Sequence, residues 1–166
     1  MKTASQILTL LIVTTLGCGQ AFAQKPTLKG PVAVYNQAYQ ETYEPDAIAY
    51  ILTKARGAYI LLDPFSEAKA GSWMQIVAAL HVGGNQVGAY ISIGTGEDWR
   101  SDFAALKPHL VSTSWNEWAG EYFVNSTNSE VIKIMQARID KIATWGFDWV
   151  EFDNMDWAFD DENRAT

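Results

Sequence analysis

The sequence predicts an α/β fold in which helices cover a parallel sheet. Strand and helix patterns alternate along the chain, and the four strand segments are almost continuously apolar, as in 58–62 (AYILL) and 87–93 (VGAYISI). Strands of that kind are typical of parallel sheets that are buried on both faces. Four of them fit either an open doubly wound sheet or part of a (β/α)8 barrel, which usually needs about 250 residues.

The first half of the chain predicts two strands and a helix between them. Residues 31–36 (PVAVYN) form the first strand, and the helix begins at Pro45, whose missing amide hydrogen costs nothing in a first turn. The helix runs to Arg56 and ends at Gly57. The second strand, 58–62, ends at Asp63.

The second half repeats this order. Ser72 caps a helix that ends near residues 83–84, and the third strand is 87–93. Residues 102–110 predict a short helix interrupted by Pro108, and 108–127 is interpreted as a functional loop. A strong helix follows, and then a fourth strand centred on Val150. That helix is capped by Asn128 or Ser129, has Val131, Met135, Ile139 and Ile142 on one face, and ends at Gly146.

The N-terminus predicts a signal peptide over residues 1–23, followed by one domain over 24–166. Its apolar run, 7–16, is too short for a membrane span, and Ala21-Phe22-Ala23 suits a cleavage site. We therefore expect a secreted or periplasmic protein cleaved after Ala23. A lipoprotein site at Cys18 is less favoured, because Thr15 stands where a branched apolar residue is expected.

The composition excludes several classes of partner. A formal charge of −7 with no Lys- or Arg-rich run argues against nucleic acid and anionic membranes and favours cationic ligands. Residues 94–99 fail the dinucleotide fingerprint, because Trp99 stands where it needs a glycine. His81 and His109 have no neighbours at metal-ligand spacing. No cofactor and no metal are expected.

Carboxylates gather where the predicted strands end, which is the edge that holds active sites in parallel α/β folds. Asp63 ends one strand, and Glu151 and Asp153 close another. Strand alternation places Trp149, Glu151 and Asp153 on one face and Asn154 on the other. Paired acids beside aromatic rings suit glycoside hydrolysis. Because side chains two apart cannot flank a sugar ring, only one of the two acids is expected to act directly.

Four motifs resemble those of glycoside hydrolase family 114. They are 90–102 (YISIG…EDWRSD), 118–124 (WAGEYFV), 135–140 (MQARID) and 146–156 (GFDWVEFDNMD). The resemblance implies a (β/α)8 barrel that acts on α-1,4-linked galactosamine polymers, with Asp153 as nucleophile or base. It also implies that a second catalytic Glu lies on a later strand, so that 24–166 is a truncated barrel of about four parallel strands. Trp149, Phe152 and Asn125 depart from the family pattern.

Together these arguments predict a site and its alternatives. Asp153 and Glu151 are the catalytic candidates. The predicted substrate-binding residues are Asp63, Tyr90, Ser92, Glu97, Asp98, Trp99, Trp118, Glu121, Asn154 and Asp156. The alternatives are a carbohydrate-binding protein without catalysis, an inactive barrel fragment, and an open-sheet domain for another small ligand. The open edges of a partial barrel also predict self-association.

Overall fold

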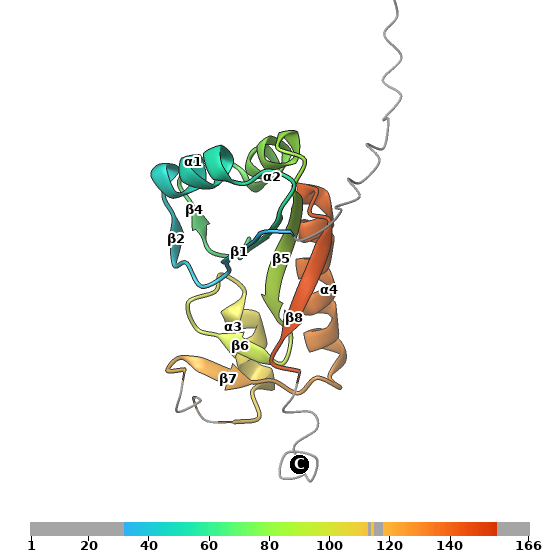
Figure 1. The fold of residues 1–166 in the computed structure, drawn as a ribbon. Coiled ribbons are helices and arrows are strands. Elements are labelled where there is room, and N and C mark those ends of the chain that lie inside the picture. The colour runs from blue at the N-terminus through green and yellow to red at the C-terminus, as the bar shows by residue number, and fades with distance from the viewer. Residues whose placement is uncertain (1–31, 113, 115–117, 156–166) are drawn as a thin grey trace, which may run out of the picture.

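Four parallel strands form the main sheet of the computed structural model, which describes residues 32–112, 114 and 118–155. The strand order is β1-β3-β5-β8 (Figure 1). The strands are β1 (Val34–Gln37), β3 (Tyr59–Leu62), β5 (Gln86–Ser92) and β8 (Trp149–Asp153). The predicted fold class, a partial (β/α) barrel of four parallel strands, is confirmed.

Three helices connect these strands and begin and end where local chemistry favours it. They are α1 (Pro45–Lys54), α2 (Trp73–Val82) and α4 (Ser129–Trp145). Ser72 and Gln75 form a reciprocal capping box at the start of α2, and the Asn128 side chain accepts from the Glu130 N–H at the start of α4. Gly146 ends α4 in the left-handed conformation, with φ 87°.

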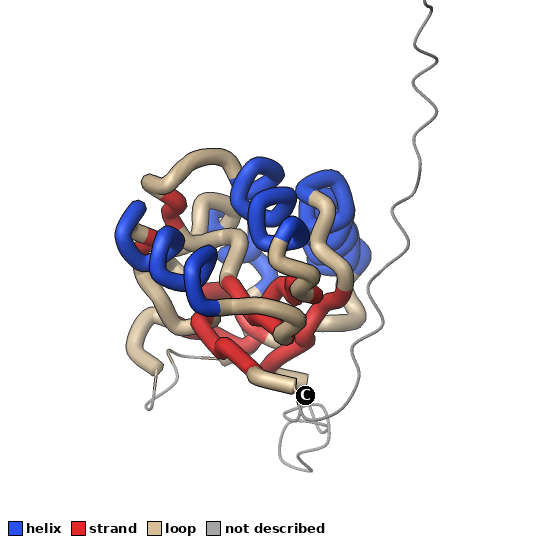
Figure 2. Tube along the Cα trace, turned by 45° about the horizontal axis from the view of Figure 1, so that its top comes forward, coloured by secondary structure: helices blue, strands red, loops and turns tan. Residues whose placement is uncertain are grey.

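The helices pack on one side of the sheet, where the main core lies (Figure 2). Ile60, Leu62 and Val87 point to this side and are fully buried against α1 and α2. Burying an aliphatic side chain contributes about 1.5–3 kcal/mol, so this layer fixes the helices on the sheet. The opposite face carries a smaller cluster that includes Leu61, Tyr90 and Trp149.

The segment 108–127, predicted as a loop, contains a strand that the sequence did not indicate. Strand β7 (Glu121–Phe123) pairs antiparallel with β6 (Thr95–Glu97), a second short strand that follows the predicted strand 87–93. A second small pair joins β2 (Thr42–Tyr43) to β4 (Glu67–Ala68). Strands of two or three residues are too short to show an alternating pattern.

The predicted short helix is present but shorter. It is divided into α3 (Phe103–Leu106) and a 3-10 turn, η1 (Lys107–His109), which contains Pro108. On the predicted face of α4, Val131, Met135 and Ile142 are buried and Ile139 is half-buried. The neighbouring Arg138, a charged residue, is also buried. Ion pairs described below explain this burial.

The parallel register decides which side chains meet on the inner face of the sheet. Gly88 lies beside Trp149, Tyr90 beside Glu151 and Ser92 beside Asp153. Gly88 leaves the space that the Trp149 ring fills, because a Cβ atom at Gly88 would lie 2.3 Å from that ring. Trp149 therefore occupies the interior of the sheet below the strand ends.

Two predictions about the ends of the chain stay predictions. Residues 1–23, with Cys18, lie outside the described residues, so the signal peptide is not tested. The described sheet ends at β1 and β8, the edges for which self-association is predicted. Among the described helices, none combines the length and the apolar character that a membrane span requires.

We expect Gly88→Ala to destabilise the protein by about 1–3 kcal/mol, because its new methyl group overlaps the Trp149 ring. Urea unfolding of a double-mutant cycle with Trp149→Ala measures this coupling. The cost of Gly88→Ala should largely disappear in the Trp149→Ala background. Gly96→Ala, whose Cβ would meet its nearest neighbour at 3.4 Å, is the matched control.

Candidate active site

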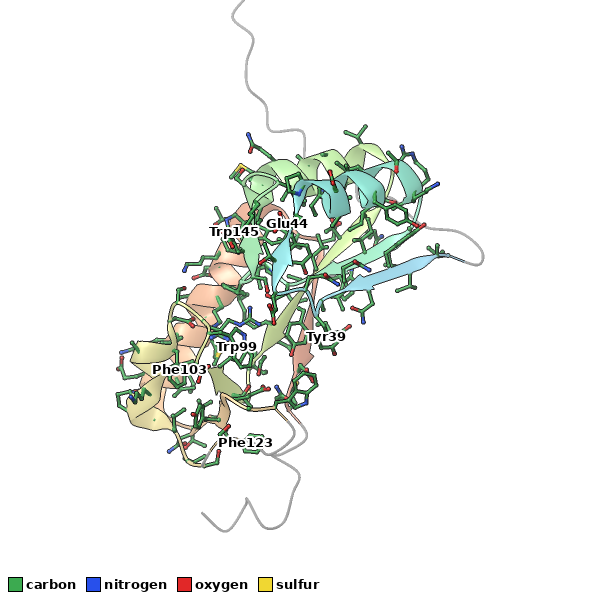
Figure 3. All side chains as sticks on the ribbon, turned by 90° about the vertical axis from the view of Figure 1, so that its left-hand side faces the viewer. Tyr39, Glu44, Trp99, Phe103, Phe123 and Trp145 are labelled. Carbon is green, nitrogen blue, oxygen red and sulfur yellow. The ribbon has the colours of Figure 1, made fainter. Side chains whose placement is uncertain are left out.

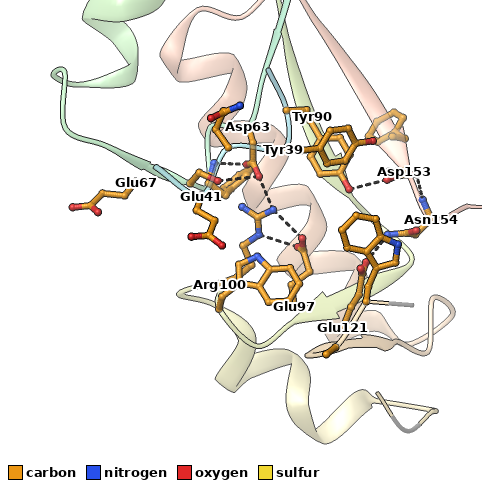
Figure 4. A pocket seen from close by; sticks show the side chains of 18 of the residues that line it. Tyr39, Glu41, Asp63, Glu67, Tyr90, Glu97, Arg100, Glu121, Asp153 and Asn154 are labelled. Atoms are coloured by element: carbon orange, nitrogen blue, oxygen red, sulfur yellow. Dashed lines mark hydrogen bonds and ion pairs between the residues drawn. The ribbon is translucent and has the colours of Figure 1, made fainter. Parts of the chain in front are cut away.

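A cavity of about 1080 Å³ opens at the carboxyl ends of the main strands (Figure 4). It is bounded by the ends of the main strands on one side and by β6 and β7 on the other. Most of the predicted site residues line it. These are Asp63, Tyr90, Glu97, Trp99, Trp118, Glu121, Asp153 and Asn154, and the sequence analysis missed Tyr39, Glu41, Glu67 and Arg100.

Asp153 lies at this edge with a hydrogen-bond donor on each of its carboxylate oxygens. Its Oδ2 accepts a hydrogen bond of 2.7 Å from the Tyr90 hydroxyl, and its Oδ1 accepts one of 2.8 Å from the Asn154 backbone N–H. Burial, together with the hydrogen bond to Asp153, raises the pKa of Tyr90 far above its ordinary value. Tyr90 therefore stays protonated and donates to Asp153 throughout the physiological range.

The structure does not bring Glu151 into the cavity. Glu151 shares a strand face with Asp153, as predicted, but it is exposed on the edge strand β8 and is not among the lining residues. The described contacts that orient Asp153 come from Tyr90 and Asn154. The charge of Glu151 does reach Tyr39, whose pKa is raised by burial and by Asp153 and Glu151.

Asn154 lies on the inner side of the sheet, not on the outer side that strand alternation predicts. Strand β8 ends at Asp153, and Asn154 turns into the left-handed region with φ 57°. This turn directs the buried carboxamide toward Ser92 and Glu121, with Nδ2 2.9 Å from Ser92 Oγ and 2.6 Å from Glu121 Oε1. The alternation rule fails here because it applies only while the backbone is extended.

Glu121 joins this buried network from β7. Its Oε1 accepts hydrogen bonds from the Thr95 hydroxyl at 2.5 Å and from Asn154, and the Thr95 hydroxyl also contacts that of Ser92. Burial raises the pKa of Glu121 against the lowering effect of the Thr95 hydrogen bond, and the charges of Glu97 and Asp153 raise it further. Ser92 lies beneath the cavity and supports it without lining it.

Arg100 holds the opposite side of the cavity together. Its guanidinium lies between two buried carboxylates, 2.6 Å from Asp63 Oδ2 and 2.8 Å from Glu97 Oε1. Burial alone would lower the pKa of Arg100, but these two acids outweigh it and raise it. Asp63 also accepts from the Phe65 N–H, so this acid is a structural anchor at the cavity wall.

Arg138 explains why a charged residue of α4 is buried. It donates to both oxygens of Asp102, at 2.7 and 2.8 Å, and to the Ser92 carbonyl at 3.0 Å. Burial would raise the pKa of Asp102, but Arg138 outweighs this effect and lowers it. Arg138 thus ties α4 to the end of β5. Both arginines lie within the quoted motifs. The helical periodicity of α4 did not indicate that Arg138 is buried.

Among the described residues, four exposed aromatic side chains line the cavity: Tyr39, Trp99, Trp118 and Phe152. Tyr39, Trp99 and Trp118 are 66%, 54% and 52% exposed, which excludes a core role for the two tryptophans. Tyr39 stacks on Trp118 with ring centroids 6.5 Å apart and an angle of 19° between the rings. Figure 3 shows Tyr39 near the end of β1 and Trp99 near β6.

Two predicted site residues lie elsewhere. Asp98 is exposed, and its backbone N–H donates to the Gly120 carbonyl at 2.9 Å, so it braces a turn and does not line the cavity. Asp156 lies outside the described residues. The described ranges also contain no group of three or more His, Cys, Asp or Glu side chains placed to hold a metal ion.

The cavity is strongly acidic. Within the described part of the chain, six carboxylates and one guanidinium line it, which gives a formal charge of −5 for these residues. Acidic walls in a partly closed cavity concentrate cations and repel anions. Carboxylates and exposed aromatic faces together can bind a sugar that carries positive charge.

We expect Glu121→Gln to raise the melting temperature at neutral pH and to have little effect in acid. Because the pKa of Glu121 is raised in the fold, the folded state holds this proton more tightly than the unfolded state does. The stability that Glu121 contributes is therefore present at low pH and lost as the pH rises through the folded-state value.

Glutamine keeps the acceptor for Thr95 and Asn154 and never ionises. Thermal unfolding from pH 4 to pH 8 tests this prediction. A variant that is less stable than the wild type at every pH would contradict it. Glu130→Gln, at an exposed position, is the control.

Comparison with known proteins relates this chain to glycoside hydrolases. The model of glycoside-hydrolase family GH114 matches residues 36–166. Ega3 of Aspergillus fumigatus, solved as a complex with galactosamine, is 22% identical with a TM-score of 0.61. The glycoside hydrolase domain of PelA from Pseudomonas aeruginosa is 16% identical with a TM-score of 0.58. An α-galactosidase from Thermus thermophilus is 13% identical with a TM-score of 0.52.

These matches cover most of this chain but at most half of each of the other proteins. The alignments cover 85%, 82% and 77% of this chain, but 50%, 49% and 32% of Ega3, PelA and the α-galactosidase. This chain thus spans about half the length of the first two structures. No curated protein matches it. The structural likeness supports the barrel-type fold, and the family match over residues 36–166 shows that the chain belongs to glycoside-hydrolase family GH114.

Proposed function

We propose that the protein is a secreted glycoside hydrolase that cleaves α-1,4-linked galactosamine-containing polysaccharide, with Asp153 as the nucleophile or base. The observation that carries this proposal is the placement of Asp153. Its two oxygens accept from Tyr90 and Asn154 at the carboxyl edge of a parallel sheet, beside a cavity with aromatic walls. A carboxylate held in a fixed orientation is what attack on an anomeric carbon, or activation of water, requires.

The charge of the cavity supports a cationic substrate. The free amino group of galactosamine is protonated at neutral pH, and a lining with a formal charge of −5 attracts this cation. Exposed Trp99 and Trp118 offer flat faces against which the apolar side of a pyranose can stack. Ega3, which has a similar fold, was solved with galactosamine bound.

Hydrolysis needs a second carboxyl group that protonates the leaving oxygen. The family resemblance assigns that role to a Glu on a strand later than β8. This assignment, and export through residues 1–23, are parts of the proposal. The alternative is a carbohydrate-binding protein without catalysis, in which the same acidic and aromatic lining binds the sugar.

Asp153→Asn is expected to lower the rate of oligosaccharide release from polygalactosamine by at least about 10³-fold, because the amide can neither attack nor activate water. A reducing-end assay measures the rate. Isothermal calorimetry on the same samples measures binding, which should remain. Asn keeps the shape of Asp: its oxygen can accept from the Asn154 N–H while its NH2 group donates to the Tyr90 hydroxyl oxygen, so a large loss of stability is not expected.

Unchanged turnover in Asp153→Asn would reject Asp153 as the catalytic group. Binding of polygalactosamine by the wild type without any product would favour the binding protein. Glu151→Gln is the matched control: it removes an exposed acid two residues away on the same strand face, so it should change kcat by less than about twofold.

Trp118→Ala should raise KM several-fold and leave the melting temperature nearly unchanged. The ring is half exposed beside the cavity, and cation–π contacts at exposed sites contribute about 0.5–1 kcal/mol. Steady-state kinetics and thermal unfolding separate the two effects. Trp73→Ala is the control, since Trp73 is 7% exposed in the main core and its removal should lower the melting temperature strongly. A Trp118→Ala variant with unaltered KM would contradict stacking.

A further inference from the structure

We propose that Asn154 is a positioning residue: its carboxamide, held by the β6–β7 side of the cavity, sets the backbone turn that orients the Asp153 carboxylate. The inference rests on the proposed function, because the orientation of Asp153 matters to the chemistry only if this acid reacts. It adds a residue that acts through Asp153 without being required to touch the substrate.

The backbone conformation of Asn154 is the first observation that supports this positioning role. Asn154 is the one non-glycine residue with positive φ in the described parts of the chain, at 57°. Side chains with a Cβ atom enter this region at an energetic cost, although Asn enters it more readily than most. The turn brings the Asn154 N–H to 2.8 Å from Oδ1 of the Asp153 side chain that precedes it. In a continuing strand, that N–H would point sideways toward a neighbouring strand and away from the Asp153 side chain.

The burial of the Asn154 side chain is the second observation. It is 7% exposed, and its Nδ2 lies 2.9 Å from Ser92 Oγ, 2.6 Å from Glu121 Oε1 and 3.3 Å from Thr95 Oγ1. These partners belong to the end of β5, to β7 and to β6. A buried carboxamide that left these partners would lose hydrogen bonds that water cannot replace. The side chain therefore holds the left-handed turn in place.

Glycine would adopt this turn with less strain, so the conformation by itself does not require Asn. What Asn adds is the link between Asp153 and the small sheet. Tyr90 binds the other carboxylate oxygen, Oδ2, at 2.7 Å. With one donor on each oxygen, the plane of the carboxylate is fixed. If the Asn154 donor moves, only the single Tyr90 hydroxyl remains, and the carboxylate can rotate about that bond.

The test is Asn154→Gly, which permits the turn but removes the carboxamide. We expect kcat on polygalactosamine to fall about 10- to 100-fold, since a displacement near 1 Å has effects of that size, while KM changes less than about twofold. The backbone amide of residue 154, followed by NMR hydrogen exchange, should exchange at least about tenfold faster, because it no longer stays on the carboxylate. Asn125→Gly, an exposed loop position, is the matched control and should alter neither quantity.

A purely structural role predicts a different pattern. It would lower the melting temperature but leave kcat and the local exchange at residue 154 unchanged in the folded protein, and that result would overturn the proposal. If Asn154→Gly does not fold, Ser92→Ala replaces it. That variant removes one partner of the Asn154 carboxamide without altering residue 154, so the same two quantities should change in the same direction, by smaller factors. No change in either would again reject the proposal.

The two hypotheses fail in distinguishable ways. If the wild type releases no oligosaccharide, the proposed hydrolysis is wrong, and the exchange of the residue-154 amide alone decides whether Asn154 holds Asp153. If the wild type is active and Asn154→Gly is equally active, the positioning role is wrong while hydrolysis stands.

Discussion

The site depends on one constraint: charged groups gather where the parallel strands end, and the fold must neutralise them away from water. Arg100 meets this need on one side by lying between Asp63 and Glu97, all three buried. Removing one partner of a buried ion pair lowers the stability of the fold far more than removing one partner of an exposed pair, because it leaves a buried charge without a partner. Arg138 applies the same principle on the outer side, where it joins α4 to Asp102 and the end of β5.

These ion pairs do not neutralise every carboxylate, and the acids that remain unpaired make the cavity negatively charged. Asp153 and Glu121 face it without a cationic partner within salt-bridge distance among the described residues, and they receive neutral donors from Tyr90, Asn154 and Thr95. Neutral donors orient an acid while leaving its charge available to a ligand. This arrangement is the one that the proposed reaction on a positively charged sugar requires.

Much of the fold could be predicted because its signals are local. Apolar runs predicted the four main strands, and Ser72, Asn128 and Gly146 marked helix ends that the structure confirms. The prediction that Asp153 faces the strand-end edge followed from strand direction alone. The short strands β6 and β7 could not be predicted, because their pairing depends on a partner more than twenty residues away and not on any pattern within them.

The sequence by itself determined the order of strands and helices, the acidic charge and the edge at which carboxylates collect, since these follow from composition and from backbone periodicity. Only the tertiary structure decided which acids share the cavity. It left Glu151 exposed on an edge strand and placed Glu121 inside. It also buried Arg138 and turned Asn154 inward. These outcomes depend on charge pairing and hydrogen bonds between distant segments, which no local pattern encodes.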